Sequence, residues 1–319
     1  MATTRSDSVA ETYISNDPKY HTHKDAAYVL PNDNVEHERL EAQAKHLQAI
    51  MNNEIIHSPI SKDLGKDREA RILDIGCGTG IVTDYLGARF PHAQVYGLDI
   101  SPVPIHIRPS HPPNVHFLQG NIVTNTSPSS WLPQSPSSAP LQSEDKFDLI
   151  FSRLLVCGMT SWPDYISSVH SLLARGGHIE LHDIDWTWYS SKSPTPEIPI
   201  SDSSRWLNAC KKAALKKGMD WEAPSHFSTY LSSAGFKDIT VKKYKWIHGG
   251  QWETDPVWKA WGDFVVEEIQ GLGWHVIPRT LEGEGYSEEE IRVFREEMLR
   301  DFEAEEGKYW EMSVVTGRK

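Results

Sequence analysis

The segment RILDIGCGTG, Arg71–Gly80, places a short apolar run directly before three glycines that alternate with other residues. The run RILDI has the composition of a buried strand, and the residues after the glycines, IVTDYLGARF, are typical of a helix start. A strand, a tight glycine turn and a helix form the opening of a βαβ unit. The segment therefore predicts an α/β fold.

Strand-like and helix-like segments alternate along the rest of the chain. Further strands are predicted at Ala93–Ile100, Asn114–Asn121, Lys146–Leu155, His178–Asp185, Lys237–Ile247 and Lys308–Lys319. Helices are predicted over residues 34–53, 162–177, 201–218, 225–236, 255–273 and 287–306. This alternation predicts a parallel sheet covered on both faces, and such sheets bind ligands at the carboxyl ends of their strands.

The spacing of the glycines distinguishes between two cofactors that lie over such a turn. A dinucleotide site needs G-x-G-x-x-G, but here the pattern is Gly76, Gly78, Gly80, and Ile81 stands where the third glycine should be. An acid, Asp74, precedes the turn, and Asp99 ends the second strand, where a carboxylate can accept hydrogen bonds from both ribose hydroxyls. The spacing favours S-adenosylmethionine over NAD or a flavin.

The stretch LDIGCGTG, with Asp99, LQGN and LLARGGHIELHD, resembles the motifs of class I S-adenosylmethionine-dependent methyltransferases. The resemblance implies a Rossmann-like fold with a seven-stranded, mainly parallel sheet, an N-terminal helical extension and helical insertions in the C-terminal half. It implies S-adenosylmethionine as cofactor and S-adenosylhomocysteine as product. The residues that we expect to bind the cofactor are Tyr28, Asp74, Gly76, Cys77, Gly78, Gly80, Asp99, Ile100, Asn121, Ile122 and Arg153.

Three longer segments are similar to the fungal LaeA-like, or UMTA-type, methyltransferases of secondary metabolism. They begin YVLPNDNVEHERLEAQAKHL, SWPDYISSVHSLLARGG and GGQWETDPVWKAWGDF, and the similarity extends from about Tyr28 to Lys319. It implies methyl transfer to a small-molecule acceptor by in-line displacement. Two alternatives stay open: a regulatory protein of the same family that binds the cofactor and acts through protein partners, and a cofactor-binding fold with other chemistry.

Composition narrows the possible partners. The formal net charge of the 319 residues is −12, which disfavours a nucleic-acid substrate. The three cysteines are far apart and suggest neither a disulfide framework nor a zinc site, and no metal is expected. Without a signal-peptide pattern or a spanning apolar run, we expect a soluble cytoplasmic protein with no membrane partner, a nuclear location also being open. The oligomeric state is left open.

We expect one methyltransferase domain over residues 28–319, after a flexible segment over residues 1–27. Its parts are a helical cap at 28–60, a cofactor-binding core at 70–186, and a helix-rich substrate cap with the final strands at 187–319. A Ser/Pro-rich loop at 124–145 interrupts the core. Within the cap at 28–60, the polar stripe Arg39, Gln43 and His46 is a candidate wall of the cofactor pocket.

Most candidates for catalysis and substrate binding lie at the carboxyl end of the fifth strand or just after it. If the acceptor is a hydroxyl, a general base is needed, and His182 and Asp185 are the candidates. Eleven of the twelve tryptophans lie after residue 150, which favours a pocket for an aromatic or apolar acceptor. The residues that we expect to line it are Trp186, Trp188, Tyr189 and Trp252.

Overall fold

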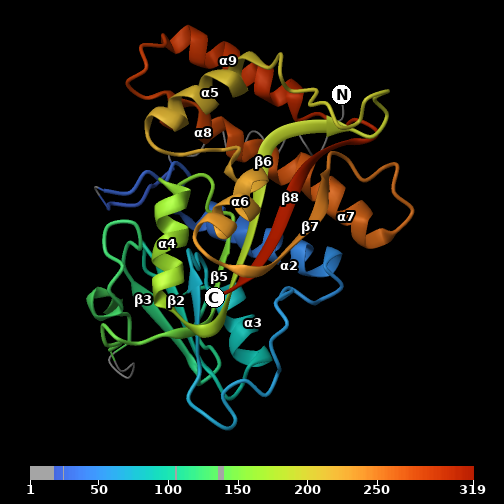
Figure 1. Cartoon of the computed structure of the whole chain (residues 1–319). Coiled ribbons are helices and arrows are strands. Elements are labelled where there is room, and N and C mark those ends of the chain that lie inside the picture. The colour runs from blue at the N-terminus through green and yellow to red at the C-terminus, as the bar shows by residue number, and fades with distance from the viewer. Residues whose placement is uncertain (1–17, 24, 105, 136–139) are drawn as a thin grey trace.

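The computed structural model describes residues 18–23, 25–104, 106–135 and 140–319. Residues 1–17 and 24 of the predicted flexible segment, and residues 136–139 of the Ser/Pro-rich loop, lie outside the described residues. The order of the helices and strands is the alternation that the sequence predicts, followed by a helix-rich C-terminal half (Figure 1).

One mixed sheet forms the centre of the molecule, with the strand order β4-β3-β2-β1-β5-β6-β8-β7. Its strands are β1 Arg71–Ile75, β2 Gln94–Asp99, β3 Val115–Gln119, β4 Leu132–Pro133, β5 Phe147–Arg153, β6 Leu173–Ser190, β7 Lys237–Ile247 and β8 Lys308–Arg318. The pairs among β1, β2, β3, β5 and β6 are parallel, whereas β8 is antiparallel to both β6 and β7. The Rossmann-like fold is confirmed, and the eighth strand is the two-residue β4 at the edge.

Helices cover both faces of this sheet. They are α2 Asn34–Ile50, α3 Ile81–Arg89, α4 Trp162–Leu172, α5 Arg205–Lys216, α6 Phe227–Ser233, α7 Pro256–Phe264, α8 Gln270–Leu281 and α9 Glu288–Asp301, with 3-10 turns at Pro128–Ser130 and Ala223–His226. Figure 1 shows α4 and α6 on one side of the sheet and α2 and α3 on the other. The central strands β1, β2 and β5 are almost wholly buried, as expected for parallel strands covered on both faces.

Several predicted helices have other ends in the structure, and two of them differ in ways that affect the fold. The helix predicted over 162–177 ends at Leu172, because the chain turns extended there and Leu173 pairs with Phe147 of β5. The helix predicted over 255–273 begins at Pro256, passes through a π-helical stretch at Val265–Ile269 and continues as α8.

The C-terminal helices form a separate layer at one end of the molecule. Helices α5, α8 and α9 pack against one another, and the long strands β6 and β8 extend toward them (Figure 1). This layer lies beyond the carboxyl ends of the parallel strands. Over the described ranges, no helix has the length and apolar character needed to span a membrane.

Candidate active site

A cleft of about 190 Å³ opens at the carboxyl ends of the parallel strands. It lies where the strand order reverses between β1 and β5, the usual ligand position in an open α/β sheet. Residues 25–32 and α2 cover it. Ten of the eleven residues predicted to bind the cofactor line it, namely Tyr28, Asp74, Gly76, Cys77, Gly78, Asp99, Ile100, Asn121, Ile122 and Arg153. The eleventh, Gly80, caps α3 just beyond the lining.

The glycine turn is shaped by close packing. An added Cβ would lie 2.3 Å from Cδ2 of Leu155 at Gly76, and 2.7 Å from the ring of Phe117 at Gly80, and both glycines have positive φ. The Gly76 amide donates to the Leu98 carbonyl at 2.8 Å. This amide is therefore satisfied within the protein, unlike the free amides of a turn that binds phosphate.

Asp99, at the end of β2, is held by amides on both of its carboxylate oxygens. Its Oδ2 accepts from the Gly78 amide and its Oδ1 from the Ser101 amide, each at 2.9 Å. Burial raises the pKa of Asp99, and these amide hydrogen bonds act in the opposite direction. Because a carboxylate accepts about four hydrogen bonds, Asp99 keeps acceptor capacity for a ligand.

Asp74 and Arg153 bring opposite charges to the same end of the cleft. Asp74 accepts a hydrogen bond from Thr83 Oγ1 at 2.7 Å, and burial raises the pKa of Asp74 to about 6. Burial lowers the pKa of Arg153 to about 10, against the attraction of Asp74. The Arg153 Nη1 atom is buried and has no hydrogen-bond partner among the described residues. The guanidinium therefore offers donors to a ligand in the cleft.

The wall next to β3 contains Ile100, Asn121 and Ile122. Asn121 Oδ1 accepts a hydrogen bond from the Val123 amide at 2.9 Å. The carbonyl oxygen of Asn121 is thus partly occupied by its own loop, and a ligand would share it with that amide.

On the opposite side, α2 presents a fixed side-chain amide to the cleft. The Arg39 guanidinium makes two hydrogen bonds of 2.7 Å to Glu36 and one of 3.0 Å from Nη1 to Gln43 Oε1. Since a guanidinium only donates, Gln43 turns its oxygen toward Arg39 and leaves its NH₂ group for the cleft that it lines. Of the predicted polar stripe, His46 instead packs against the ring of Phe264.

His37 also lines the cleft, although its sequence position carries no distinguishing signal. Its Nε2 lies 2.7 Å from Asn32 Oδ1, and Asn32 Nδ2 donates to Ser101 Oγ at 2.9 Å. These contacts place the proton of His37 on Nε2. Burial lowers the pKa of His37, and the neighbouring His106 lowers it further, so a neutral ring faces the cleft.

The turn after β5 closes the end of the cleft next to Arg153. Leu154 has φ +57°, and the amides of Leu155 and Val156 donate to Asp183 Oδ2 at 2.7 and 3.0 Å. Burial raises the pKa of Asp183, against these amide hydrogen bonds. Asp183, from the stretch HDID, thus shapes the cleft without lining it, which its sequence position does not reveal.

Comparison with known proteins identifies the family of this fold. Residues 41–241 match the family described as a methyltransferase domain. The chain belongs to this family. The resemblance seen in the sequence is confirmed, and the family uses S-adenosylmethionine as its methyl donor.

Fungal proteins are among the relatives of this methyltransferase. The methyltransferase pytC of Aspergillus terreus is 28% identical over 306 residues, covering 94% of this chain and 86% of pytC. The secondary metabolism regulator LAE1 of Cochliobolus heterostrophus is 26% identical over 274 residues, covering 84% and 82%.

A solved structure, phosphoethanolamine N-methyltransferase 2 of Haemonchus contortus, is 13% identical with a TM-score of 0.47. The match covers 99% of this chain and 57% of that one, so the methyltransferase spans little more than half the length of this neighbour.

The structure does not bring the two predicted bases, His182 and Asp185, to the cleft of the methyltransferase. His182 is fully buried, and its Nε2 lies 2.8 Å from Glu180 Oε1. Asp185 accepts hydrogen bonds from Thr187 and Ser225. His182 pairs with Arg153 of β5, but its side chain points to the face of the sheet where His57 packs. Asp185 lies further along β6, beyond the residues that pair with β5.

The aromatic residues predicted to contact substrate also lie outside the cleft lining. Trp186 stacks on Trp221, and Trp188 is buried with its Nε1 donating to His248 Nε2 at 3.0 Å. Tyr189 stacks on Tyr309, while Trp252 is 42% exposed. Trp186 and Trp188 form part of the core between β8 and the helical layer, because extended β6 carries them there.

Proposed function

We propose that this methyltransferase transfers the methyl group of S-adenosylmethionine to a small-molecule acceptor in the cleft under residues 25–32. The observation that carries the proposal is the pair Asp74 and Arg153 beside Asp99. A carboxylate near a guanidinium whose Nη1 has no hydrogen-bond partner among the described residues complements the ammonium and carboxylate groups of the methionine part.

The remaining lining supports the same orientation of the cofactor. Asp99 would accept hydrogen bonds from the ribose hydroxyls, and Ile100 and Ile122 would contact the faces or edges of the adenine. The glycine turn, with Cys77, lies between these two ends. The sulfonium methyl would then point toward the cover formed by Tyr28 and the turn after β5.

The surroundings of the methyl position favour an apolar or aromatic acceptor. Leu40, Leu154, Leu155 and Met159 line the cleft, with few polar groups among them. Methyl transfer needs the acceptor atom in line with the methyl and the sulfur, and such orientation supplies up to roughly 7 to 11 kcal/mol of the barrier. We assign no general base, because neither His182 nor Asp185 reaches the cleft.

Calorimetric titration tests the cofactor part of this proposal. S-adenosylmethionine and S-adenosylhomocysteine should bind saturably with one site per chain, and NAD should not bind. Asp99→Ala should lower the affinity for both adenosyl ligands, since it removes charge-assisted hydrogen bonds that are worth about 1.5–3 kcal/mol each. Saturable NAD binding without a response to either adenosyl ligand would contradict the proposal.

A second experiment tests the acceptor. The pure protein is incubated with methyl-labelled cofactor and a low-molecular-weight extract of the source organism, and the products are read by mass spectrometry. A labelled small molecule that is absent with Asp99→Ala supports the enzymatic function. The regulatory alternative is favoured by the relatives named secondary metabolism regulators. If the protein is a regulator, no small molecule in the extract should become labelled. Pull-downs should then recover stable protein partners.

A further inference from the structure

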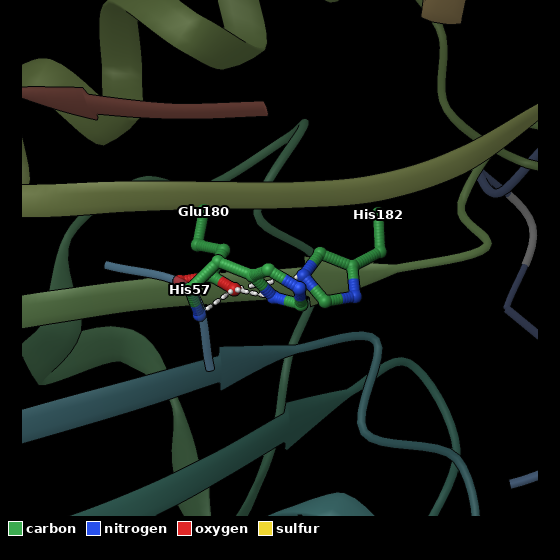
Figure 2. Close-up of side chains that lie close together, drawn as sticks. All are labelled: His57, Glu180 and His182. Carbon is green, nitrogen blue, oxygen red and sulfur yellow. Dashed lines mark hydrogen bonds and ion pairs between the residues drawn. The ribbon is translucent and has the colours of Figure 1, made fainter. Parts of the chain in front are cut away.

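Two histidines and one glutamate converge as Figure 2 shows, and none of them lines the cleft. Glu180 and His182 lie two residues apart on β6, so their side chains share one face of the strand. His57 comes from the loop before β1, more than a hundred residues away in the chain. One donor atom from each of the three lies within 4.8 Å of the others.

We propose that His57, Glu180 and His182 bind a divalent transition-metal ion of the Zn²⁺ class. Two imidazoles and one carboxylate are a donor set that zinc favours, at bond lengths of about 2.0–2.2 Å. His182 Nε2 lies 2.8 Å and His57 Nδ1 3.5 Å from Glu180 Oε1. Tetrahedral bonds of that length separate donors by about 3.4 Å, so sub-ångström side-chain shifts bring these two distances to what an ion requires.

The surrounding hydrogen bonds orient the carboxylate for this role. Glu180 Oε2 accepts from the amide of Ser58 at 2.8 Å and from its hydroxyl at 2.6 Å, which leaves Oε1 facing both imidazoles. The His57 amide donates to Oε1 at 2.8 Å. Such outer contacts are typical of carboxylate ligands to metals.

Both histidines can present a lone pair to an ion. His182 Nδ1 is buried without a hydrogen-bond partner in the described part of the chain, so moving the proton there breaks only the bond to Glu180. If His57 binds through Nδ1, its Nε2 carries the proton and donates to Tyr244 Oη, 2.8 Å away. Metal binding through Nδ1 would break the hydrogen bond between His57 Nδ1 and the Ile55 carbonyl, which are 2.9 Å apart.

Charge and access also favour a cation. Glu180 and His182 are fully buried, and over the described residues no lysine or arginine forms an ion pair with Glu180. The His57 side chain is 17% exposed, which gives an ion a path from solvent. A bound ion would supply the missing positive charge next to a buried carboxylate.

The position of the site indicates a structural role. None of the three residues lines the cleft, and together they join the loop before β1 to β6 and, through Tyr244, to β7. An ion that binds only the folded chain stabilises it in proportion to the logarithm of its concentration. This inference does not depend on the proposed function.

Zinc titration of the full-length protein, stripped with a chelator and dialysed, tests the site. We expect one tightly bound equivalent by elemental analysis, a higher melting temperature with zinc, and visible absorption bands of a four-coordinate ion when Co²⁺ is the probe. His182→Ala and His57→Ala should weaken zinc binding at least about tenfold and abolish the zinc-dependent rise in melting temperature. His92→Ala, at an exposed histidine, is the matched control and should behave like the wild type.

If His182→Ala does not fold, His182→Gln replaces it, because Gln keeps an N–H donor for Glu180. Equal zinc content and equal zinc-dependent stabilisation in the wild type and the His57 and His182 variants would overturn the proposal. So would a wild type that retains no zinc after dialysis, which would leave the cluster as a hydrogen-bonded link only.

Discussion

Arg153 shows how the surroundings of one residue define its role. As a guanidinium it could form a surface ion pair, the usual outcome for an arginine. Instead its Nη1 is buried at the edge of the cleft, near Asp74, with no hydrogen-bond partner in the part of the chain that the structure describes. Leaving such a donor unsatisfied costs free energy that a ligand carboxylate would recover. Residue-scale predictions therefore concern this pair.

Arg153→Met should lower the affinity for S-adenosylhomocysteine roughly 10- to 100-fold, since the substitution removes charge-assisted hydrogen bonds worth about 1.5–3 kcal/mol. The variant should bind 5′-methylthioadenosine as the wild type does, because that ligand lacks the amino-acid part. Calorimetry of both ligands measures the difference. Arg175→Met, at an exposed arginine, is the control. An equal loss for both ligands would show that Arg153 does not bind the carboxylate.

The affinity for S-adenosylhomocysteine should depend on pH through Asp74. Burial raises the pKa of Asp74 to about 6, so the carboxyl is mostly neutral below that pH and attracts the ligand ammonium only above it. Affinity should rise from about pH 5 to about pH 7 and then level off. Asp74→Asn should bind weakly with a flat profile over this range. A wild-type profile that falls with rising pH would contradict the assignment.

At the scale of elements, β6 serves three different parts of the molecule. Glu180 and His182 face the loop before β1, and Asp183, on the other face, holds the turn after β5. Further along, the strand passes the edge of the cleft and enters the core of the C-terminal half. Because successive side chains of a strand point to opposite faces of the sheet, residues that are neighbours in the sequence of β6 serve different parts of the molecule.

Asp183→Ala should lower both stability and ligand affinity. The amides of Leu155, Val156 and Ile184 lose their acceptor, and each unsatisfied buried group costs about 1–3 kcal/mol. Because that turn lines the cleft, S-adenosylhomocysteine should bind about tenfold more weakly. Denaturant unfolding and calorimetry measure the two effects. Asp185→Ala should destabilise the fold without changing affinity, and a parallel loss of affinity there would contradict the positioning role.

For the molecule as a whole, a cluster of buried aromatic rings ties the sheet to the helical layer. The Trp310 ring of β8 lies 5.0 Å from that of Trp188, 5.4 Å from that of Trp186 and 5.2 Å from that of Phe302, measured between centroids. Rings at these separations contribute packing and edge-to-face attraction. The tryptophans of the second half therefore stabilise the connection between the two layers.

Trp188→Ala should reduce the free energy of unfolding by about 3–5 kcal/mol, because it opens a cavity in this cluster. Trp252→Ala should change it by less than about 0.5 kcal/mol, since its side chain is partly exposed. Denaturant unfolding measures both values. If Trp188→Ala is as stable as the wild type, the ring is not part of the core.

The sequence by itself determined the mainly parallel sheet, the presence of two late strands and the glycine turn with Asp74 and Asp99 near the strand ends. Those features depend on apolar runs, glycines and acids at fixed spacing. Each such pattern spans only a few residues, so it can be read from the sequence. The C-terminal end of the helix predicted at 162–177 depended on strand pairing and was not predictable from its own residues.

Only the tertiary structure decided which side chains share a site. The sequence shows His182 and Asp185 at the carboxyl end of a strand and Trp188 just after it. In the structure β6 continues to Ser190, which carries Asp185 and Trp188 past the cleft, whereas His182 points to the face of the sheet where His57 packs. Likewise His57 meets Glu180, 123 positions later in the chain, because the loop before β1 packs against β6. Contacts between residues so far apart follow from how the layers pack, and no local pattern encodes them.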